Sequence, residues 1–318
     1  MTSRPHDALF KSAFEAPAAA AALLRELLPT TVREAVAWQT LDRETGSFVD
    51  TALADRHSDL LFSARLRTGD HALLYFLLEH QSTGDPVMPL RMLSYQIRIW
   101  DRFRKLQPAA WIPPVIAVLV SHVPGGWATS RSFDDMFDPE VMAIPGLAAL
   151  VPRFSMIVDD LAHLSNGDLS ARSLAAFQKL ALWLLRDARD PERLLANFGA
   201  WSSALAEVQR APAGIDSFAT LVTYMFRVVG PMNLDELRVK IRQLGPAAEE
   251  AAMTIAEYLH EEGRKEGRIA TLRSLLVLKF QTLDADHEAR LEAATPEALD
   301  RYTERLLIAD SLAAVFED

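Results

Sequence analysis

The pattern of hydrophobic and polar positions changes along the chain. Residues 5–28 carry apolar side chains at helical spacing, and Pro17 is expected to divide them into two helices. Between residues 48 and 81, short apolar runs flank the turn sequence TGD at 68–70, which predicts two strands joined in a hairpin. Beyond residue 165 the pattern is helical almost throughout. We therefore expect a mixed α/β (α+β) front part followed by a largely α-helical part.

The second strand of the hairpin, within residues 73–81, is apolar on both faces, so it is expected to lie centrally in its sheet. Residues 88–106 predict a helix with Pro89 in its first turn. Residues 115–122 predict another buried strand, parallel to the first because a helix connects the two. A further strand is expected within residues 152–161.

The length and charge of the chain suggest more than one part. A chain of 318 residues is expected to form one large domain or two smaller ones. We place a first domain at 1–195, with its core at about 5–125, and a helical region at 196–318 that is a candidate for oligomerisation or regulation. The net charge is −10, yet residues 1–110 hold 13 basic and 13 acidic side chains. This balance leaves room for a local basic groove in an acidic protein.

Several classes of protein are excluded or disfavoured by composition. The chain has no cysteine, which excludes disulfides, thiolate zinc sites and a cysteine nucleophile. The N-terminus lacks the apolar core of a signal peptide, and no apolar run approaches the ~18 residues of a membrane span. We therefore expect a cytoplasmic protein without a membrane partner.

The end of the second hairpin strand carries the first candidate chemistry. Alternation along a strand places Glu79 and Gln81 on one face. A hairpin centred on residues 68–70 places Asp59 opposite about residue 79. Two facing carboxylates repel unless a cation lies between them, and a hard divalent cation suits oxygen ligands. The alternative is that both carboxylates simply meet solvent at the ends of their strands.

Five stretches, in this order along the chain, together resemble one known family: HDALFKSAF, SDLLFSARL, LLYFLLEHQS, MPLRMLSYQIRIW and PPVIAVLVSH. This is the Rpn family of recombination-promoting nucleases, also labelled PD-(D/E)XK nuclease family transposases. The resemblance covers residues 5–165, and the charged, glycine-bearing segment at 258–268 is similar to the family's tail.

The resemblance implies a fold and an activity. The fold is a PD-(D/E)XK restriction-endonuclease-like core of a helix, a three-strand meander, a helix and a fourth strand. The activity is Mg²⁺-dependent (or other divalent-cation-dependent) DNA endonuclease cleavage that leaves 3′-hydroxyl and 5′-phosphate ends. The biological setting is DNA recombination, mobile elements or phage defence. Asp59 and Glu79 are implied as catalytic metal ligands, with the peptide carbonyl of His80 as a further ligand and catalytic Gln81 at the family's lysine position.

Gln81 departs from the general pattern, because an amide orients by hydrogen bonds but carries no charge. Lys11 and Arg65 are candidate substitutes for the missing cation. His57 shares the strand face of Asp59, where it is either a proton relay or an exposed histidine. Asp7 either favours the N-terminus of the first helix or adds a carboxylate to the metal site.

A basic helix face is the candidate DNA contact, and its alternative is a solvated face. It consists of Arg91, Arg98, Arg102 and Lys105.

Two other functions remain open: a catalytically inactive DNA-binding or scaffold protein that retains the nuclease fold, and a helical interaction protein whose acidic rear half binds a regulatory partner. A homodimer is an expectation from the chemistry of double-strand cutting. Gly263 and Gly267 fit either a loosely packed solvated helix or a helix that pairs with a second chain.

Overall fold

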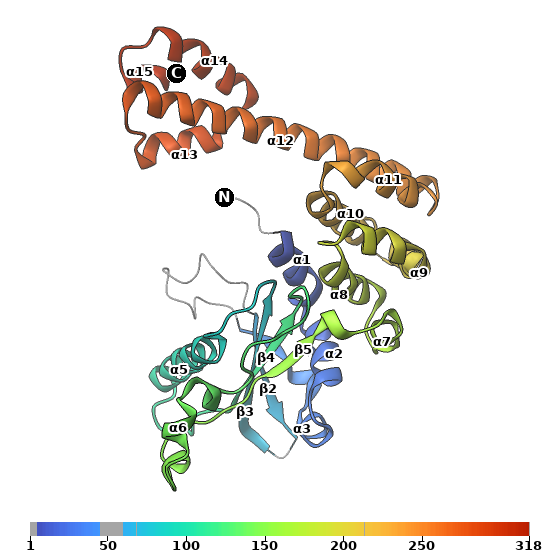
Figure 1. Ribbon diagram of the computed structural model, residues 1–318, viewed down its shortest axis with the longest axis vertical. Coiled ribbons are helices and arrows are strands. Elements are labelled where there is room, and N and C mark those ends of the chain that lie inside the picture. The colour runs from blue at the N-terminus through green and yellow to red at the C-terminus, as the bar shows by residue number, and fades with distance from the viewer. Residues whose placement is uncertain (1–4, 45–59, 68, 213, 318) are drawn as a thin grey trace. The chain divides into compact units, whose positions relative to one another are not determined.

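The computed structural model describes residues 5–44, 60–67, 69–212 and 214–317, with the main chain alone at 69–75, 77–79 and 231. The chain divides into two compact units, Met1–Glu249 and Glu250–Asp318. The first unit contains the sheet and the helices that cover it (Figure 1). The boundary at 195/196, which was predicted for the end of the nuclease-like domain, stays a prediction.

The sheet has five strands in the order β1–β2–β3–β4–β5. Their bounds are β1 Asp42–Arg43, β2 Leu60–Leu66, β3 Gly69–Gln81, β4 Val115–Ser121 and β5 Ile157–Asp160. The first three strands are antiparallel neighbours, whereas β4 runs parallel to β3 and β5 parallel to β4. The predicted hairpin, central strand, parallel strand and further strand are therefore confirmed.

Helices cover both faces of the sheet, which explains the continuous apolar runs of its central strands. Helix α5 (Met88–Leu106) connects β3 to β4 and packs on one face, where Leu61 and Leu119 meet Met92 and Ile99. Helices α1 (Pro5–Phe14) and α2 (Pro17–Leu27) lie on the opposite side (Figure 1). The break predicted at Pro17 is observed, because this proline opens α2.

The register of the hairpin agrees with the spacing expected from its turn. Leu60 pairs with Leu78, and the pairing continues to Arg65 opposite Leu73 before a bulge precedes the turn. Asp59 and His57 lie outside the described residues, and so does the side chain of Glu79. The facing carboxylates therefore stay a prediction, supported by the register of their described neighbours.

The remaining chain is helical after β5, as predicted. The helices of the first unit not yet given are α3 Thr30–Ala35, α6 Pro139–Met142, α7 Asn166–Ala171, α8 Ala176–Asp187, α9 Pro191–Arg210, α10 Gly214–Val229 and α11 Leu234–Arg242. Helices α8 and α10 both pack against α1, so the helical bundle reaches the sheet through the first helix. Of the helices described, none has the length and apolarity that crossing a membrane requires.

The second unit is a small helical body. Helix α12 (Pro246–Phe280) enters it, and α13 (Ala285–Ala293), α14 (Pro296–Ile308) and α15 (Leu312–Val315) pack on the end of α12 around Leu276, Leu299 and Phe316. Gly263 and Gly267 lie on α12, where an added Cβ would meet open space. Packing within the described chain therefore does not require glycine at either position.

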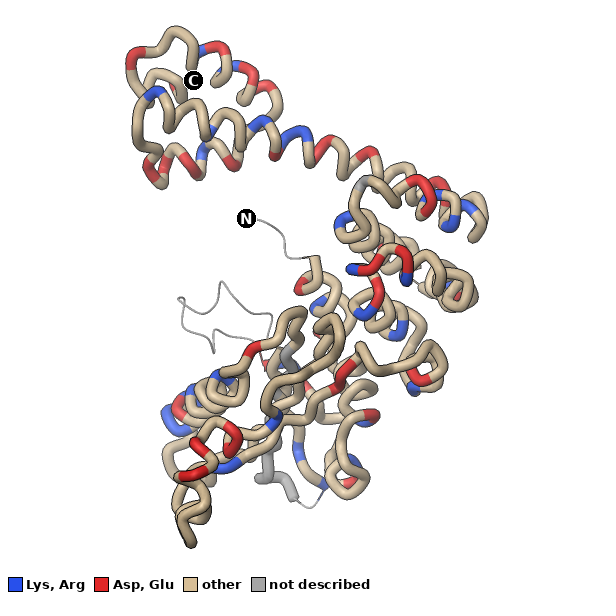
Figure 2. Tube along the Cα trace, in the orientation of Figure 1, with Lys and Arg blue, Asp and Glu red and all other residues tan. Residues whose placement is uncertain are grey.

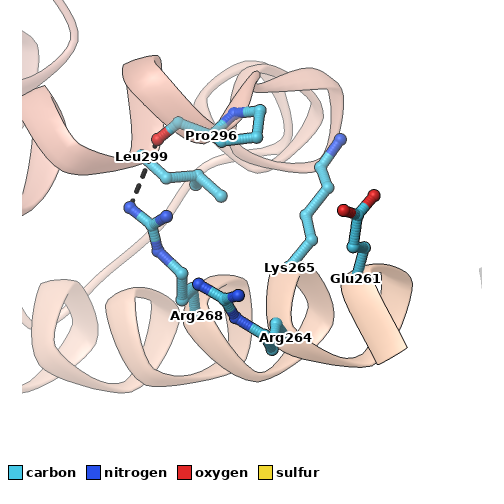
Figure 3. A pocket seen from close by; sticks show the side chains of 6 residues that line it. All are labelled: Glu261, Arg264, Lys265, Arg268, Pro296 and Leu299. Atoms are coloured by element: carbon cyan, nitrogen blue, oxygen red, sulfur yellow. Dashed lines mark hydrogen bonds between the residues drawn. The ribbon is translucent and has the colours of Figure 1, made fainter. Parts of the chain in front are cut away.

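Basic side chains of α12 line a cavity of about 230 Å³ beside the start of α14 (Figure 3). The lining residues are Glu261, Arg264, Lys265, Arg268, Pro296 and Leu299. Arg268 bonds the carbonyl of Pro296 and the carboxylate of Asp300, so α14 itself neutralises part of this basic surface.

A buried charge network holds α8 against α9. The carboxylate of Asp187, which is 0% exposed, accepts hydrogen bonds from Trp183, Asn197 and Arg186 and forms an ion pair with Arg193. The side chain of Arg186 is only 1% exposed. Removing the acid would therefore leave a buried cation short of its partner.

We expect Asp187→Ala to lower the free energy of unfolding by about 3–5 kcal/mol, because it breaks a buried ion pair and leaves the other charge behind. The control is Asp190→Ala, which removes the side chain that caps α9 through the Arg193 amide and should cost only about 1 kcal/mol. Urea unfolding followed by circular dichroism measures both. Equal losses for the two variants would contradict the account of Asp187.

Candidate functional site

The carboxyl end of β3 carries Glu79, His80 and Gln81, which stand in register with Leu119, Val120 and Ser121 of β4. The pairing extends beyond β4, because the amide of His122 donates to the carbonyl of Gln81 at 2.8 Å. Since the carboxyl ends of the parallel strands β3, β4 and β5 meet at one edge, polar residues at all three ends share this edge. The sheet thus fixes the main chain at the end of β3.

His80 is buried and belongs to the sheet face covered by α1. Its ring lies 4.7 Å from that of Phe10 and 5.8 Å from that of His122. The Nε2 atom lies 3.1 Å from Oδ1 of Asp7, which is ion-pair distance, although the angles are not those of a well-formed hydrogen bond. Asp7, in the first turn of α1, is thereby brought to the end of β3.

His6 links this cluster to the helical bundle. The Nε group of Arg189 donates to Nε2 of His6 at 3.2 Å, so the ring proton belongs on Nδ1. That Nδ1 lies 2.8 Å from the hydroxyl of Tyr224, which in turn faces the carbonyl of Leu184 at 3.5 Å. The chain of donors and acceptors is consistent only with a neutral His6.

Burial and the nearby arginine disfavour the charged forms of His6 and His122. Burial, followed by the charges of Arg189 and His80, lowers the pKa of His6 from 6.5 to about 4, against an opposing effect of Asp7. Burial and the charges of His80, His6 and Arg189 lower the pKa of His122 well below 6.5, while the Leu185 carbonyl opposes this shift. Burial also raises the pKa of Tyr224 above its usual range.

Arg189 reaches the site from the turn between α8 and α9. Its Nη1 donates to the carbonyl of Ser82 at 2.8 Å, one residue past Gln81. Arg189 is separated from Ser82 by 107 positions in the sequence. No local pattern marked it, so sequence reasoning missed this residue, together with His6 and Tyr224.

The acids at the end of β5 already have partners. Asp159 is held by both terminal nitrogens of Arg172, at 2.7 and 2.6 Å. Asp160 accepts from the Trp127 amide at 2.8 Å and lies 2.9 Å from the ring of His163. Among the described residues, no group of three or more potential ligands is arranged to hold a metal ion. The predicted ligand pair is not tested by this observation, because it involves Asp59.

The two cations proposed to replace the missing lysine differ in position. Arg65 pairs with Leu73, six residues before Glu79, or about 20 Å along an extended strand. This separation argues against a role for Arg65 beside Gln81. Lys11 lies on α1, half-buried, one turn beyond Asp7.

The basic side chains predicted to contact DNA do lie along α5 (Figure 2). Arg91, however, forms an ion pair with Asp85 at 2.6 Å. Arg98 and Arg102 are half-buried, and Lys105 is exposed. The exposure of these four side chains therefore differs, and the most exposed of them, Lys105, lies at the carboxyl end of the helix.

The lowered pKa of His6 predicts that the free energy of unfolding decreases toward acid pH. Because the folded-state pKa of His6 is below its unfolded value, the unfolded chain binds more protons between pH about 6.5 and about 4. The contribution of the histidine to the free energy of unfolding is then complete above pH 6.5. It decreases as the pH drops, by at most about 1.4 kcal/mol per pH unit for each such histidine.

We expect His6→Gln to reduce the loss of stability at acid pH. A glutamine amide can accept a hydrogen bond from Arg189 without taking up a proton. Urea midpoints measured from pH 7.5 to 4.5 provide the test, with the exposed His260 replaced by glutamine as the control. An unchanged slope in His6→Gln would refute the assignment.

Curated relatives were found over most of the chain. The recombination-promoting nuclease RpnD of Escherichia coli O157:H7 is 27% identical over 265 residues, 82% of this chain and 96% of the relative. The inactive recombination-promoting nuclease-like protein RpnE of E. coli K12 is 26% identical over 301 residues, 94% of this chain and 96% of the relative. RpnA of the same strain, a recombination-promoting nuclease, is 25% identical over 276 residues, 86% of this chain and 90% of the relative.

No solved structure is significantly similar to this one. The model of a family described as "Putative transposase, YhgA-like" matches residues 4–214, the stretch that holds the whole sheet, the histidine cluster and Arg189. The predicted resemblance is confirmed, and the chain belongs to the YhgA-like putative transposase family, as a relative of the Rpn recombination-promoting nucleases.

Proposed function

We propose that this protein is a cytoplasmic, metal-dependent DNA endonuclease that hydrolyses phosphodiester bonds in the course of recombination, mobile-element transfer or phage defence. The observation that carries the proposal is the register of β2 and β3, in which Leu60 faces Leu78. If that pairing continued by one residue, it would bring Asp59 opposite Glu79. The names of the relatives RpnD and RpnA, both recombination-promoting nucleases, support the same reaction.

The donor set that we propose suits a hard cation. Two carboxylates and the peptide carbonyl of His80 are oxygen ligands of the kind that Mg²⁺ prefers, and the end of β3 is fixed by its neighbour β4. A divalent cation bound there lowers the pKa of a bound water and polarises a phosphoryl oxygen. Glu79 and Asp59 would hold the cation, and Gln81 would orient water or phosphate by hydrogen bonds.

The contacts of His80 would hold the end of β3 in place. The His80 ring is enclosed by Phe10 and His122 and faces Asp7, so the main chain on either side of it cannot shift freely. Lys105 and its neighbours on α5 would bind the phosphates of DNA without reading base sequence.

A second candidate function is DNA binding without cleavage. Gln81 lacks the charge of a lysine, and RpnE, a relative that aligns with 94% of this chain, is named an inactive nuclease-like protein. A homodimer and a regulatory protein partner for the helical region also stay predictions.

We expect Glu79→Ala to reduce Mg²⁺-dependent nicking of a supercoiled plasmid by about 100-fold or more, because it removes a ligand of the cation that stabilises the developing charge. Addition of EDTA should abolish nicking by the wild-type protein. The matched control is Glu34→Ala, which removes an exposed acid from α3.

The same samples separate the candidate functions by their DNA affinity. Wild-type protein that binds the plasmid but never cuts it supports the inactive alternative. Absence of both binding and cutting favours the helical interaction protein instead. Cutting by Glu79→Ala at the wild-type rate would refute the proposed metal site.

We expect Lys105→Ala to weaken DNA binding equally for unrelated sequences and to reduce the slope of log K against log salt by about 1, because one phosphate contact is lost. Fluorescence anisotropy between 50 and 200 mM NaCl measures the slope. Arg301→Ala, which removes an exposed cation from α14, is the control. If Lys105→Ala left the slope of log K against log salt unchanged, the proposed contact between Lys105 and DNA would be contradicted.

A further inference from the structure

An apolar surface lies at the end of the sheet away from the proposed metal site. The strands β4 and β5 begin at Val115 and Ile157, so the segments that lead into these two parallel strands meet at their amino ends. Val115 and Phe154 pack against the same hydrophobic cluster, which places the two segments side by side. Figure 1 shows α6 and the chain that follows it at this end of the sheet, away from α1.

Both segments expose large apolar side chains. Trp111, in the segment 106–114 that leads into β4, is 96% exposed, and Leu150, in the segment 139–152 that leads toward β5, is 82% exposed. Residues 141–151 contain no charged or polar side chain. The other large apolar side chains exposed in these segments are Leu106, Ile112, Val141 and Ile144. Extended apolar patches of this kind are uncommon on monomeric proteins and mark sites of interaction.

The segment that leads toward β5 is held in a defined conformation. At its base, the Phe133 amide donates to the Phe154 carbonyl at 2.9 Å. At its tip, the Leu147 amide donates to the Ile144 carbonyl at 3.1 Å across a proline and Gly146, whose φ of 84° favours glycine. A segment that is ordered in advance loses little conformational entropy on binding, so its apolar side chains stabilise a complex effectively.

The charges beside this surface have opposite signs on its two segments. The chain around α6 carries the exposed acids Asp135, Asp138 and Glu140, whereas α5 ends in exposed cations that include Arg104 (Figure 2). Arg104 and Glu140 form no ion pair within the described part of the chain. The acids disfavour DNA and anionic lipid as occupants. A two-fold rotation sets the acidic side of one copy against the basic side of another, so the surface is complementary to itself.

We propose that this surface is the interface of a two-fold homodimer, in which Trp111 and Leu150 supply apolar contacts and Glu140 of each copy faces Arg104 of the other. The interface lies at the opposite end of the sheet from Glu79. The inference therefore goes beyond the proposed nuclease function and does not depend on it.

Sedimentation velocity of the full-length protein at about 1 to 50 µM tests the proposal, because this range reports dissociation constants near 1 µM. The wild type should sediment as a dimer in the upper part of the range. Leu150→Asp should raise the dissociation constant about 100-fold or more, because it buries a charge in an apolar contact. The matched control is Leu307→Asp on α14, where the side chain is 79% exposed, and it should leave the constant unchanged.

Exchange of charges tests which surfaces meet. Glu140→Arg and Arg104→Glu should each weaken the dimer about 10-fold, because each sets like charges against one another. The double variant should recover most of the wild-type affinity, since the attraction returns with its signs exchanged. Circular dichroism and thermal unfolding show whether each variant keeps its fold.

A wild type that stays monomeric throughout this range overturns the proposal, and so do equal dissociation constants for the wild type and folded Leu150→Asp. Dissociation by Leu307→Asp would place the interface in the second unit instead. Failure of the double variant to recover affinity would overturn the two-fold arrangement on which the choice of a second copy rests. A monomer that floats with phosphatidylcholine vesicles, and no longer floats as Leu150→Asp, would assign the surface to lipid and also overturn the homodimer. Nicking activity enters none of these readouts, so failure of the proposed function is distinguishable from failure of this inference.

Discussion

The position of β3 between an antiparallel and a parallel neighbour constrains everything else in the site. Both edges of the strand are hydrogen-bonded, by β2 on one side and β4 on the other, and helices cover both faces of the sheet. A strand buried in this way accommodates polar chemistry only where it ends. Glu79 and Gln81 therefore follow a long apolar run, and the fold itself decides where they lie.

The helical bundle reaches the end of β3 through a small polar contact. Helix α1 packs against α8 and α10, and the pair of bonds from Arg189 to His6 and Ser82 joins the bundle to the end of β3. Because the acceptors are neutral, the contact orients a cation instead of neutralising it. His6 and His122 favour their neutral forms for the same electrostatic reason, since burial and the arginine both disfavour a second positive charge.

Local sequence signals predicted the elements and the register well. Pro17 marked the break between α1 and α2. The pairing expected from a turn at 68–70 places Leu60 opposite Leu78, as observed, although β3 itself already begins at Gly69. Apolar runs identified β3 and β4 because burial on both faces leaves a clear pattern. These features depend on contacts between residues that are close in sequence or joined by one turn.

The rest of the site depends on contacts that no local pattern encodes. Tyr224 meets His6 across 218 positions, and Arg189 meets Ser82 across 107. Two arginines, Arg186 and Arg189, look alike in the sequence, yet Arg186 is buried in an ion pair and Arg189 is exposed. Packing decided between them. The pairing of Asp59 with Glu79, in contrast, stays a prediction from sequence. The register of Leu60 with Leu78 supports it, but Asp59 itself lies outside the described residues.

The most direct test of the account is a crystal structure of the protein soaked with Mn²⁺, examined by anomalous scattering. The account predicts one strong anomalous peak within about 2.0–2.6 Å of carboxylate oxygens from both Asp59 and Glu79. A peak elsewhere, or carboxylates too far apart for one ion to bridge, would contradict the proposed site.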